Sequence, residues 1–321
     1  LYTAFNAGSP GSPGWGIPMA TDIAFAVGVL ALFGSRVHPS LKVFLLSLAV
    51  ADDIGAILVI AVFYSAGIGW PALGLAALLV GAMLALRRLH VVWLPIYGVI
   101  GFFVWFATLE SGVHATIAGV VLGLLAPARP LRGADEAPGD IQVPDSDEGV
   151  PAAWFRTWRK RSYELVAPCE RLEHALHPYS SFLVIPIFAL ANAGVRLGGD
   201  DLTNSLTSSV TLGIVVGLVL GKLIGITLFA YLAQRAGFAE IPAGVTWPEL
   251  TGVAALGGIG FTVSLFIAGL AFSDAALIDE AKVGILAASV LAAGVGAVLL
   301  LQRASRGGDV PVALGEIDAE T

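Results

Sequence analysis

The run from Leu41 to Tyr64 constrains this chain most, because its apolar interior carries two adjacent carboxyls, Asp52 and Asp53. At a helical rise of roughly 1.5 Å per residue, the pair lies about 17 Å from the start of the run, near the middle of a bilayer's hydrocarbon core. Inserting an aspartate at that depth costs on the order of 3 kcal/mol. Such residues are rarely kept for stability, so the pair indicates a functional site.

The composition is that of a membrane protein. Of the 321 residues, 57% are apolar and only 13% are charged, whereas soluble domains are about 25% charged. The mean hydropathy of +0.85 agrees with this. The net charge of −7 includes many acids in polar segments, where solvated loops explain them. We expect an all-α, polytopic membrane protein with no cofactor and no nucleic-acid partner.

Hydropathy predicts nine spans, near residues 13–34, 41–64, 70–86, 91–109, 112–126, 179–195, 210–234, 249–272 and 282–301. These divide the chain into five spans within 1–126, a cytoplasmic loop over 127–178, four spans within 179–302 and a cytoplasmic tail over 303–321. The loop contains DEAPGDIQVPDSDEG, whose composition predicts disorder. It also contains WFRTWRKRSYELVAP, a basic and aromatic stretch that is typical of a helix lying at the headgroups.

Basic residues are distributed unevenly between the two sets of loops. Fourteen of the 17 Lys and Arg residues follow spans one, three, five, seven and nine, whereas the opposite loops hold only Arg196 and Lys282. By the positive-inside rule the first set of loops is cytoplasmic, which predicts a cytoplasmic C-terminus.

Two of the spans are interrupted. In the first span Pro18 is followed by Thr21 and Asp22, which are helix N-cap residue types. We expect a helix that stops and restarts in mid-membrane; the alternative is a plain proline kink with Asp22 facing a neighbour. The eighth span has GGIG at its centre, which alone is equally typical of close helix packing. Two interrupted spans in corresponding halves indicate an inverted-repeat transporter with its site at the midplane.

The seventh span carries Lys222 about a dozen residues from either end, too deep for the ammonium to snorkel to the surface. The ammonium must therefore find a carboxylate, a carbonyl or water inside the protein. Asp22, Asp52 and Asp53 are the intramembrane acids of comparable depth.

The chain contains, in this order, PMATDIAFAVGVLALFGSRV, LKVFLLSLAVADDIGAILVIAVFY, SGVHATIAG, RLEHALHP, FALANAGV, GKLIG and GGIGFTVSLFIA. This set resembles the bacterial NhaA-type sodium/proton antiporter family over nearly all of the chain except the loop at 130–165. The resemblance implies a secondary transporter rather than an enzyme, built as an inverted repeat with two unwound helices that cross.

The resemblance also implies roles for individual residues. Asp53 would be the principal sodium- and proton-binding carboxylate, with Asp52 as its neighbour and as the partner or competitor of Lys222. Sodium would be held at Asp53 and Asp52, with the Thr21 hydroxyl beside them. Asp22 would offset the N-terminal helix dipoles at the crossing, and Lys222 the C-terminal ones.

Four further residues match positions that the family associates with pH response. Glu173, His174 and His177 correspond to its pH-sensing cluster, and His114 to another histidine of that kind. There are two alternatives to a pH-sensing role for the RLEHALHP motif. Its residues could be ordinary interfacial side chains, or, with less support, a zinc site built on a single His-x-x-His.

Residue 1 is Leu, and members of the family have twelve spans. We therefore expect the chain to be an N-terminally truncated fragment that lacks the first three spans. The family's dimerising hairpin would lie in that part, so a homodimer would depend on it.

The predicted mechanism is competition. A hard oxygen site takes sodium or lithium only once protons leave its carboxylates, so a site exposed alternately to each side exchanges one ion for the other. With two titrating carboxyls the exchange would be electrogenic. The alternatives are a sodium-coupled solute symporter of related fold, and an intramembrane aspartyl protease, whose two carboxyls come from separate helices.

Overall fold

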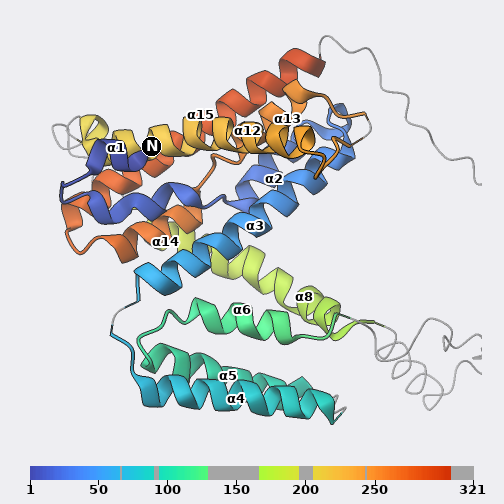
Figure 1. Ribbon diagram of the computed structural model, residues 1–321, viewed down its shortest axis with the longest axis vertical. Helices are drawn as coiled ribbons and strands as arrows, with labels where there is room; N and C mark the ends of the chain where they lie inside the picture. Colours follow the sequence, from blue (N-terminus) through green and yellow to red (C-terminus); the bar gives the residue numbers. More distant parts are fainter. Residues whose placement is uncertain (66, 90–93, 129–165, 195–204, 243, 305–321) are drawn as a thin grey trace, which may run out of the picture. The chain divides into compact units, whose positions relative to one another are not determined.

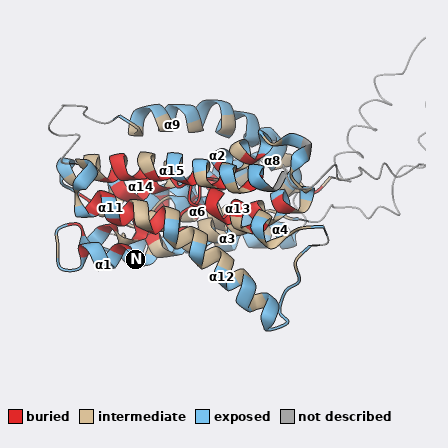
Figure 2. Cartoon of the chain, turned by 90° about the horizontal axis from the view of Figure 1, so that it is seen from above, coloured by how far each residue is buried: buried red, intermediate tan, exposed pale blue. Residues whose placement is uncertain are grey.

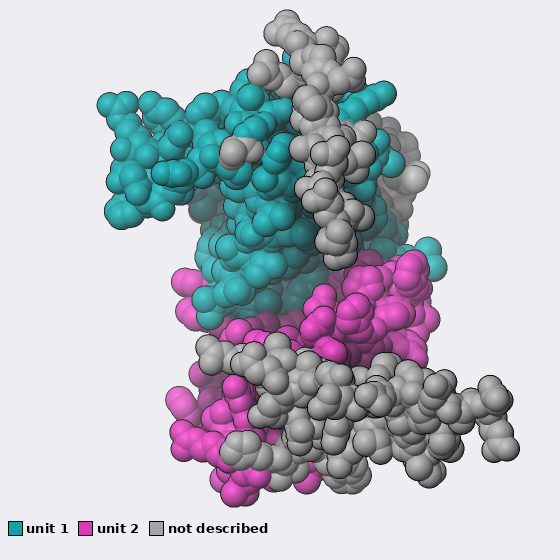
Figure 3. All heavy atoms as spheres, turned by 90° about the vertical axis from the view of Figure 1, so that its right-hand side faces the viewer, with its two compact units in different colours: residues 1–60, 189–321 teal, residues 61–188 magenta. Residues whose placement is uncertain are grey.

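The computed structural model describes residues 1–65, 67–89, 94–128, 166–194, 205–242 and 244–304, and every element in these ranges is helical. The all-α prediction is therefore confirmed for the described part. The predicted disordered stretch, nearly all of the headgroup stretch and the tail after residue 304 lie outside the described residues. The chain divides into two compact units, residues 1–60 with 189–321 and residues 61–188, which Figure 3 colours separately.

Apolar helices occupy all nine predicted spans. By length and hydropathy six are long enough to cross a bilayer, or seven if the bent pair at 247–271 counts as one span. Two shorter apolar helices, Pro95–Glu110 and Thr116–Leu125, coincide with the fourth and fifth predicted spans. The chain is thus a polytopic helical membrane protein.

Two helical runs begin earlier than the predicted spans that they contain. The sixth helical run begins at Pro168 rather than near residue 179, and passes from α8 (Pro168–Tyr179) through the π-helical turn η4 (Ser180–Val184) into α9 (Ile185–Asn192). The ninth begins at Ala275, as α15 (Ala275–Ala304). Both extensions carry charged residues, and a hydropathy window misses them although the helical hydrogen bonds continue.

The unit formed by residues 61–188 contains α4 (Trp70–Arg88), α5 (Leu94–Glu110), α6 (Thr116–Leu125), α8 and η4. Its small core joins Met83, Val104 and Ala118 from the first three of these helices. The Arg87 guanidinium donates to the Leu125 carbonyl oxygen at 3.1 Å, which connects the ends of α4 and α6.

The other unit contains α1 (Tyr2–Asn6), the 3₁₀ segments η1 (Ser12–Met19) and η2 (Gly34–Arg36), α2 (Ile23–Ala31), most of α3 (Pro39–Phe63), α11 (Ser209–Val215), the π-helical segment η5 (Val216–Gly221), α12 (Lys222–Arg235), α13 (Trp247–Leu256), α14 (Phe261–Ala271) and α15 (Figure 1). Helix α15 packs against α11, α13 and α14. Buried residues concentrate on these helices (Figure 2).

Both interruptions are present. Helix η1 ends at Met19 and α2 begins at Ile23, and the residues between them include Ala20 and Asp22 with extended backbone, at ψ 147° and 101°. The first span therefore restarts, and the alternative of a plain proline kink is wrong. In the second case four residues separate the end of α13 at Leu256 from the start of α14 at Phe261, and the two helices are bent by 46°.

The second interruption uses glycine for close approach. A Cβ on Gly258 would collide with the Leu218 carbonyl oxygen and lie 3.1 Å from the Cβ of Ala292. A Cβ on Gly217 would lie 2.8 Å from the Cβ of Pro18 in η1. Gly258 thus allows the second interruption to approach the η5 backbone and the Ala292 side chain of α15, and Gly217 allows η5 to pack against Pro18 in the first interrupted span.

We predict that Gly258→Ala lowers the free energy of unfolding by about 1–3 kcal/mol, because overpacking a tight interior forces its neighbours apart. The measurement is thermal or denaturant unfolding of the purified protein in detergent. Gly269→Ala, in α14, is the matched control, since an added Cβ meets nothing within 4 Å there. Equal effects of the two substitutions would contradict the packing argument.

Candidate functional site

The two interruptions are joined to each other by hydrogen bonds. The Asp22 backbone N–H donates to the Ile259 carbonyl oxygen at 2.6 Å, and the Thr21 hydroxyl lies 2.7 Å from the Gly257 carbonyl oxygen. Backbone groups that a broken helix frees must find partners inside the protein, because lipid offers none. Each interruption therefore supplies partners for the other.

Asp22 occupies the start of two helices at once. Its carboxylate accepts from the Phe25 N–H at 3.1 Å, which caps α2. It also accepts from the Thr262 N–H at 3.0 Å and the Thr262 hydroxyl at 2.6 Å, in the first turn of α14. Because helix N-termini carry partial positive charge, a single buried carboxylate is well placed to offset both.

Lys222 pairs with Asp52. The ammonium contacts the Asp52 carboxylate directly and lies 3.3 Å from the Thr21 hydroxyl, which is itself 2.8 Å from the same Asp52 oxygen. The side chains of Lys222 and Asp52 are only 11% and 23% exposed, and Thr21 is fully buried. Sequence reasoning left Lys222 three candidate acids, and the tertiary structure selects Asp52.

Asp53 differs from its neighbour. Its Oδ1 is buried and has no hydrogen-bond partner within the part of the chain that the structure describes. Consecutive residues on a helix point about 100° apart, so Lys222 cannot serve both carboxylates in the same way. Asp53 therefore holds a buried oxygen that can take a proton or a cation.

The four residues matched to pH response belong to the other compact unit. The His114 Nε2 lies 2.7 Å from the Tyr64 carbonyl oxygen. Glu173, His174 and His177 are exposed on α8. The structure thus brings Thr21, Asp22, Asp52 and Lys222 together in one hydrogen-bonded cluster with Asp53 beside it, and none of the four pH residues belongs to that cluster.

Two contributors to the crossing were not assigned roles from the sequence. Thr262 binds Asp22, and the buried Ser264 hydroxyl donates to the Ile17 carbonyl oxygen at 2.9 Å. The sequence did contain an indication of these roles. Both hydroxyl residues lie in the first turn after GGIG, and the start of a helix favours side chains of this type. Their partners in the first span are 240 or more residues away and cannot be read from local pattern.

Within the described residues, no group of three or more His, Cys, Asp or Glu side chains is placed to hold a metal ion. A cation at this cluster would therefore use a small number of carboxylate, hydroxyl and carbonyl oxygens, which is the ligand set that hard cations such as sodium prefer.

Comparison with known proteins identifies the family. The sequence model of the family described as Na+/H+ antiporter 1 matches residues 1–300. The chain is 46% identical over 310 residues to "Na(+)/H(+) antiporter NhaA" of Rhodopirellula baltica, an alignment that covers 94% of this chain and 69% of that protein. It is 43% identical over 313 residues to the protein of the same name from Syntrophobacter fumaroxidans, covering 92% and 66%.

A third relative is "Na(+)/H(+) antiporter NhaA 1" of Acidiphilium cryptum, 47% identical over 315 residues, with 94% of this chain and 68% of that protein covered. The chain thus spans about two thirds of the length of the curated relatives it matches. The matches run through both interrupted spans and through the helices that carry Asp52, Asp53 and Lys222, so the chain belongs to the Na+/H+ antiporter 1 family, which is a family of transporters and not of enzymes.

Proposed function

We propose that Asp53 is the carboxylate that carries sodium, lithium or a proton during antiport. One observation supports this assignment most directly: Asp53 Oδ1 is buried without a partner in the described residues, whereas Asp52 is engaged by Lys222 and Thr21. An unpartnered buried carboxylate oxygen is costly, so it favours a bound proton or cation.

Exchange follows from competition at that oxygen. When Asp53 holds a proton, an incoming cation loses its charged ligand. When the proton leaves, sodium can bind Asp53, and Asp52 with the Thr21 hydroxyl can complete an oxygen site if Lys222 gives up Asp52. Because one site serves both ions, exposing it alternately to each side exports sodium against protons, and titration of both carboxyls makes the exchange electrogenic.

The setting is the bacterial inner membrane, with the C-terminus and the 127–178 loop on the cytoplasmic side. The excess of Lys and Arg in the loops on that side supports this orientation. Glu173, His174, His177 and His114 regulate exchange by pH, because they match the positions that the family associates with pH response. A homodimer and bound lipid complete the proposed assembly.

The two alternative functions are less well supported. A protease dyad needs carboxyls from separate helices, whereas Asp52 and Asp53 are consecutive on α3 and one of them is paired with Lys222. A symporter would need an organic solute bound at the cluster, where the described contacts are hydroxyl, carbonyl, carboxylate and ammonium groups that suit a bare ion.

Asp53→Asn is expected to abolish sodium-dependent proton movement, because the amide can neither release a proton nor supply a negative ligand. The measurement is the decay of an imposed pH gradient on adding sodium to everted vesicles that contain the whole protein. Asp274→Asn is the matched control, since that exposed residue accepts from the Ala276 N–H and lies away from the cluster. Exchange that survives in Asp53→Asn would disprove the assignment.

Asp52→Asn and Lys222→Met should each lower the free energy of unfolding by about 3 kcal/mol, because each leaves one shielded charge without its partner. The double variant should recover much of that loss, as measured by unfolding in detergent. Pairing Lys222→Met with Asp53→Asn should give a smaller coupling, since Asp53 makes no direct contact with Lys222. Additive losses for Asp52 and Lys222 would show that the pair does not form.

His177→Ala should shift the pH at which exchange activity rises, measured as the pH profile of sodium-dependent proton movement. The substitution removes a side chain that matches the position the family associates with pH response. Leu176→Ala, at an exposed neighbour on α8, should leave the profile in place. An unchanged profile in His177→Ala would remove this residue from pH regulation.

A further inference from the structure

An open groove of about 400 Å³ lies on the larger unit between α12 and α13. Five residues between Leu223 and Tyr231 line it from α12, and Trp247 and Thr251 line it from α13. The Thr251 hydroxyl donates to the Trp247 carbonyl oxygen at 2.8 Å, and the Thr227 hydroxyl oxygen is buried. The surface of the groove is therefore apolar, and at roughly 1.5 Å of rise per residue it extends about 12 Å along α12.

One face of α12 continues from the groove to a cation. Leu228, Tyr231 and Arg235 follow one another at spacings of three and four residues, which places them on the same side of the helix. The Tyr231 ring packs edge-on against the Trp247 ring, with the ring centroids 5.6 Å apart. The Arg235 guanidinium donates to the Tyr231 hydroxyl at 3.2 Å. The guanidinium thus lies at one end of the groove.

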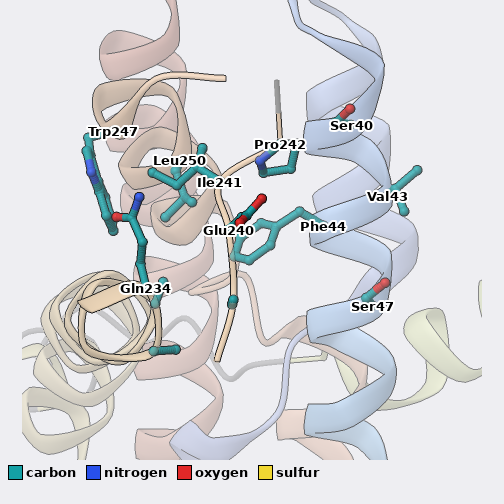
Figure 4. Close-up of a pocket in the computed structure, with 13 residues that line it drawn as sticks. Ser40, Val43, Phe44, Ser47, Gln234, Glu240, Ile241, Pro242, Trp247 and Leu250 are labelled. Carbon is teal, nitrogen blue, oxygen red and sulfur yellow. The ribbon is translucent and has the colours of Figure 1, made fainter. Parts of the chain in front are cut away.

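The acidic side chains near this end of α12 are directed elsewhere. Glu240 lines a second cavity, of about 550 Å³, which Trp247 also borders and which extends to α3 (Figure 4). The Glu249 carboxylate accepts from the N–H and the hydroxyl of Thr246 at the start of α13. Within the described part of the chain, no acidic side chain pairs with Arg235. The exposed guanidinium can therefore bind an anion from the surroundings.

The groove ends at a membrane surface. Helix α12 completes the apolar span at 209–235, so Arg235 marks the point where this span leaves the hydrocarbon. Tyrosine and tryptophan are enriched at headgroup depth, which is where Tyr231 and Trp247 then lie. Long basic side chains at this depth extend to the phosphate layer. In the proposed orientation this is the cytoplasmic leaflet, whose anionic lipids attract cations.

We propose that the groove binds an acyl chain of a bilayer phospholipid and that Arg235 binds the phosphate of the same molecule. The proposal rests on the proposed function for the side of the membrane, and it gives the bound lipid a specific place. An apolar groove, two amphipathic rings and a guanidinium follow one another in the order of chain, glycerol and phosphate in such a lipid. The lipid joins α12, which carries Lys222, to α13, which leads into the second interruption.

Native mass spectrometry of the whole protein, transferred from detergent, measures its affinity for added phosphatidylglycerol. Arg235→Gln should weaken binding of the first lipid about fivefold, which is the usual contribution of one arginine near an anionic headgroup. Arg36→Gln is the matched control, because it removes an exposed arginine of η2 that lies outside the groove lining. Equal losses in the two variants, or no loss in Arg235→Gln, would overturn the phosphate contact.

Filling the groove tests the acyl chain. Leu228→Trp should weaken binding of phosphatidylglycerol about tenfold, because the indole occupies the space of the chain. Leu232→Trp is the matched control on the same helix: Leu232 is 47% exposed, against 48% for Leu228, and lies outside the groove lining. Equal effects of the two substitutions would overturn the groove as the site of the chain. A dimer mass that Leu228→Trp abolishes would make the groove a contact between two copies and would also overturn the proposal.

Two partial ligands separate the lipid from its components. Dioleoylglycerol, which lacks the phosphate, should bind the unsubstituted protein and Arg235→Gln equally. Glycerol 3-phosphate, which lacks the chains, should not bind at concentrations where phosphatidylglycerol saturates the site. Binding of glycerol 3-phosphate as tight as that of the lipid would assign Arg235 to a free phosphate ester and overturn the proposal. Because these measurements do not depend on exchange, Asp53→Asn should bind the lipid normally, and loss of the lipid site and failure of the Asp53 assignment give different results.

Discussion

The structure depends on one constraint: two helices are broken inside an apolar medium, and the backbone groups this frees must be satisfied within the protein. Thr21 and Asp22 from the first interruption bond to Gly257 and Ile259 of the second. Ser264 bonds in the reverse direction, to Ile17. Neither span could break alone in lipid without unpaired groups that cost several kcal/mol. Each interrupted span therefore supplies hydrogen-bond partners for the other. The glycines at 257–260 allow the two backbones to approach closely enough to form these bonds.

Charge at the crossing follows from the same constraint. The starts of α2 and α14 meet at Asp22, which accepts from both and offsets their partial positive charge. Lys222 pairs with Asp52 and lies beside Thr21. These contacts leave Asp53 Oδ1 as the buried carboxylate oxygen without a partner among the described residues. In the proposed function, ions exchange at that carboxylate oxygen, and Asp22, Asp52 and Lys222 stabilise the backbone around it.

Helical periodicity connects this site to its surroundings. Leu48 lies one helical turn before Asp52 on α3, and Ile226 lies one turn after Lys222 on α12. An ideal Cβ on Gly257 would lie 3.7 Å from Leu48 Cδ2 and 2.9 Å from Ile226 Cδ1, so both side chains pack against the second interruption. The residues next to the ion pair on both helices therefore contact the crossing as well.

The sequence by itself determined the all-α membrane class and the nine apolar segments, and it favoured a restart over a kink after Pro18, because hydropathy and cap chemistry are local. It missed the early starts of α8 and α15, because Glu170, Arg171 and Glu173 in α8 and Asp279 and Glu280 in α15 lower the local hydropathy although the backbone is helical. Only the tertiary structure decided that Lys222 binds Asp52 rather than Asp22 or Asp53, that Thr262 binds Asp22, and that Leu48 packs against Gly257. Those contacts join residues 170 or more positions apart, and no local pattern contains the packing that brings them together.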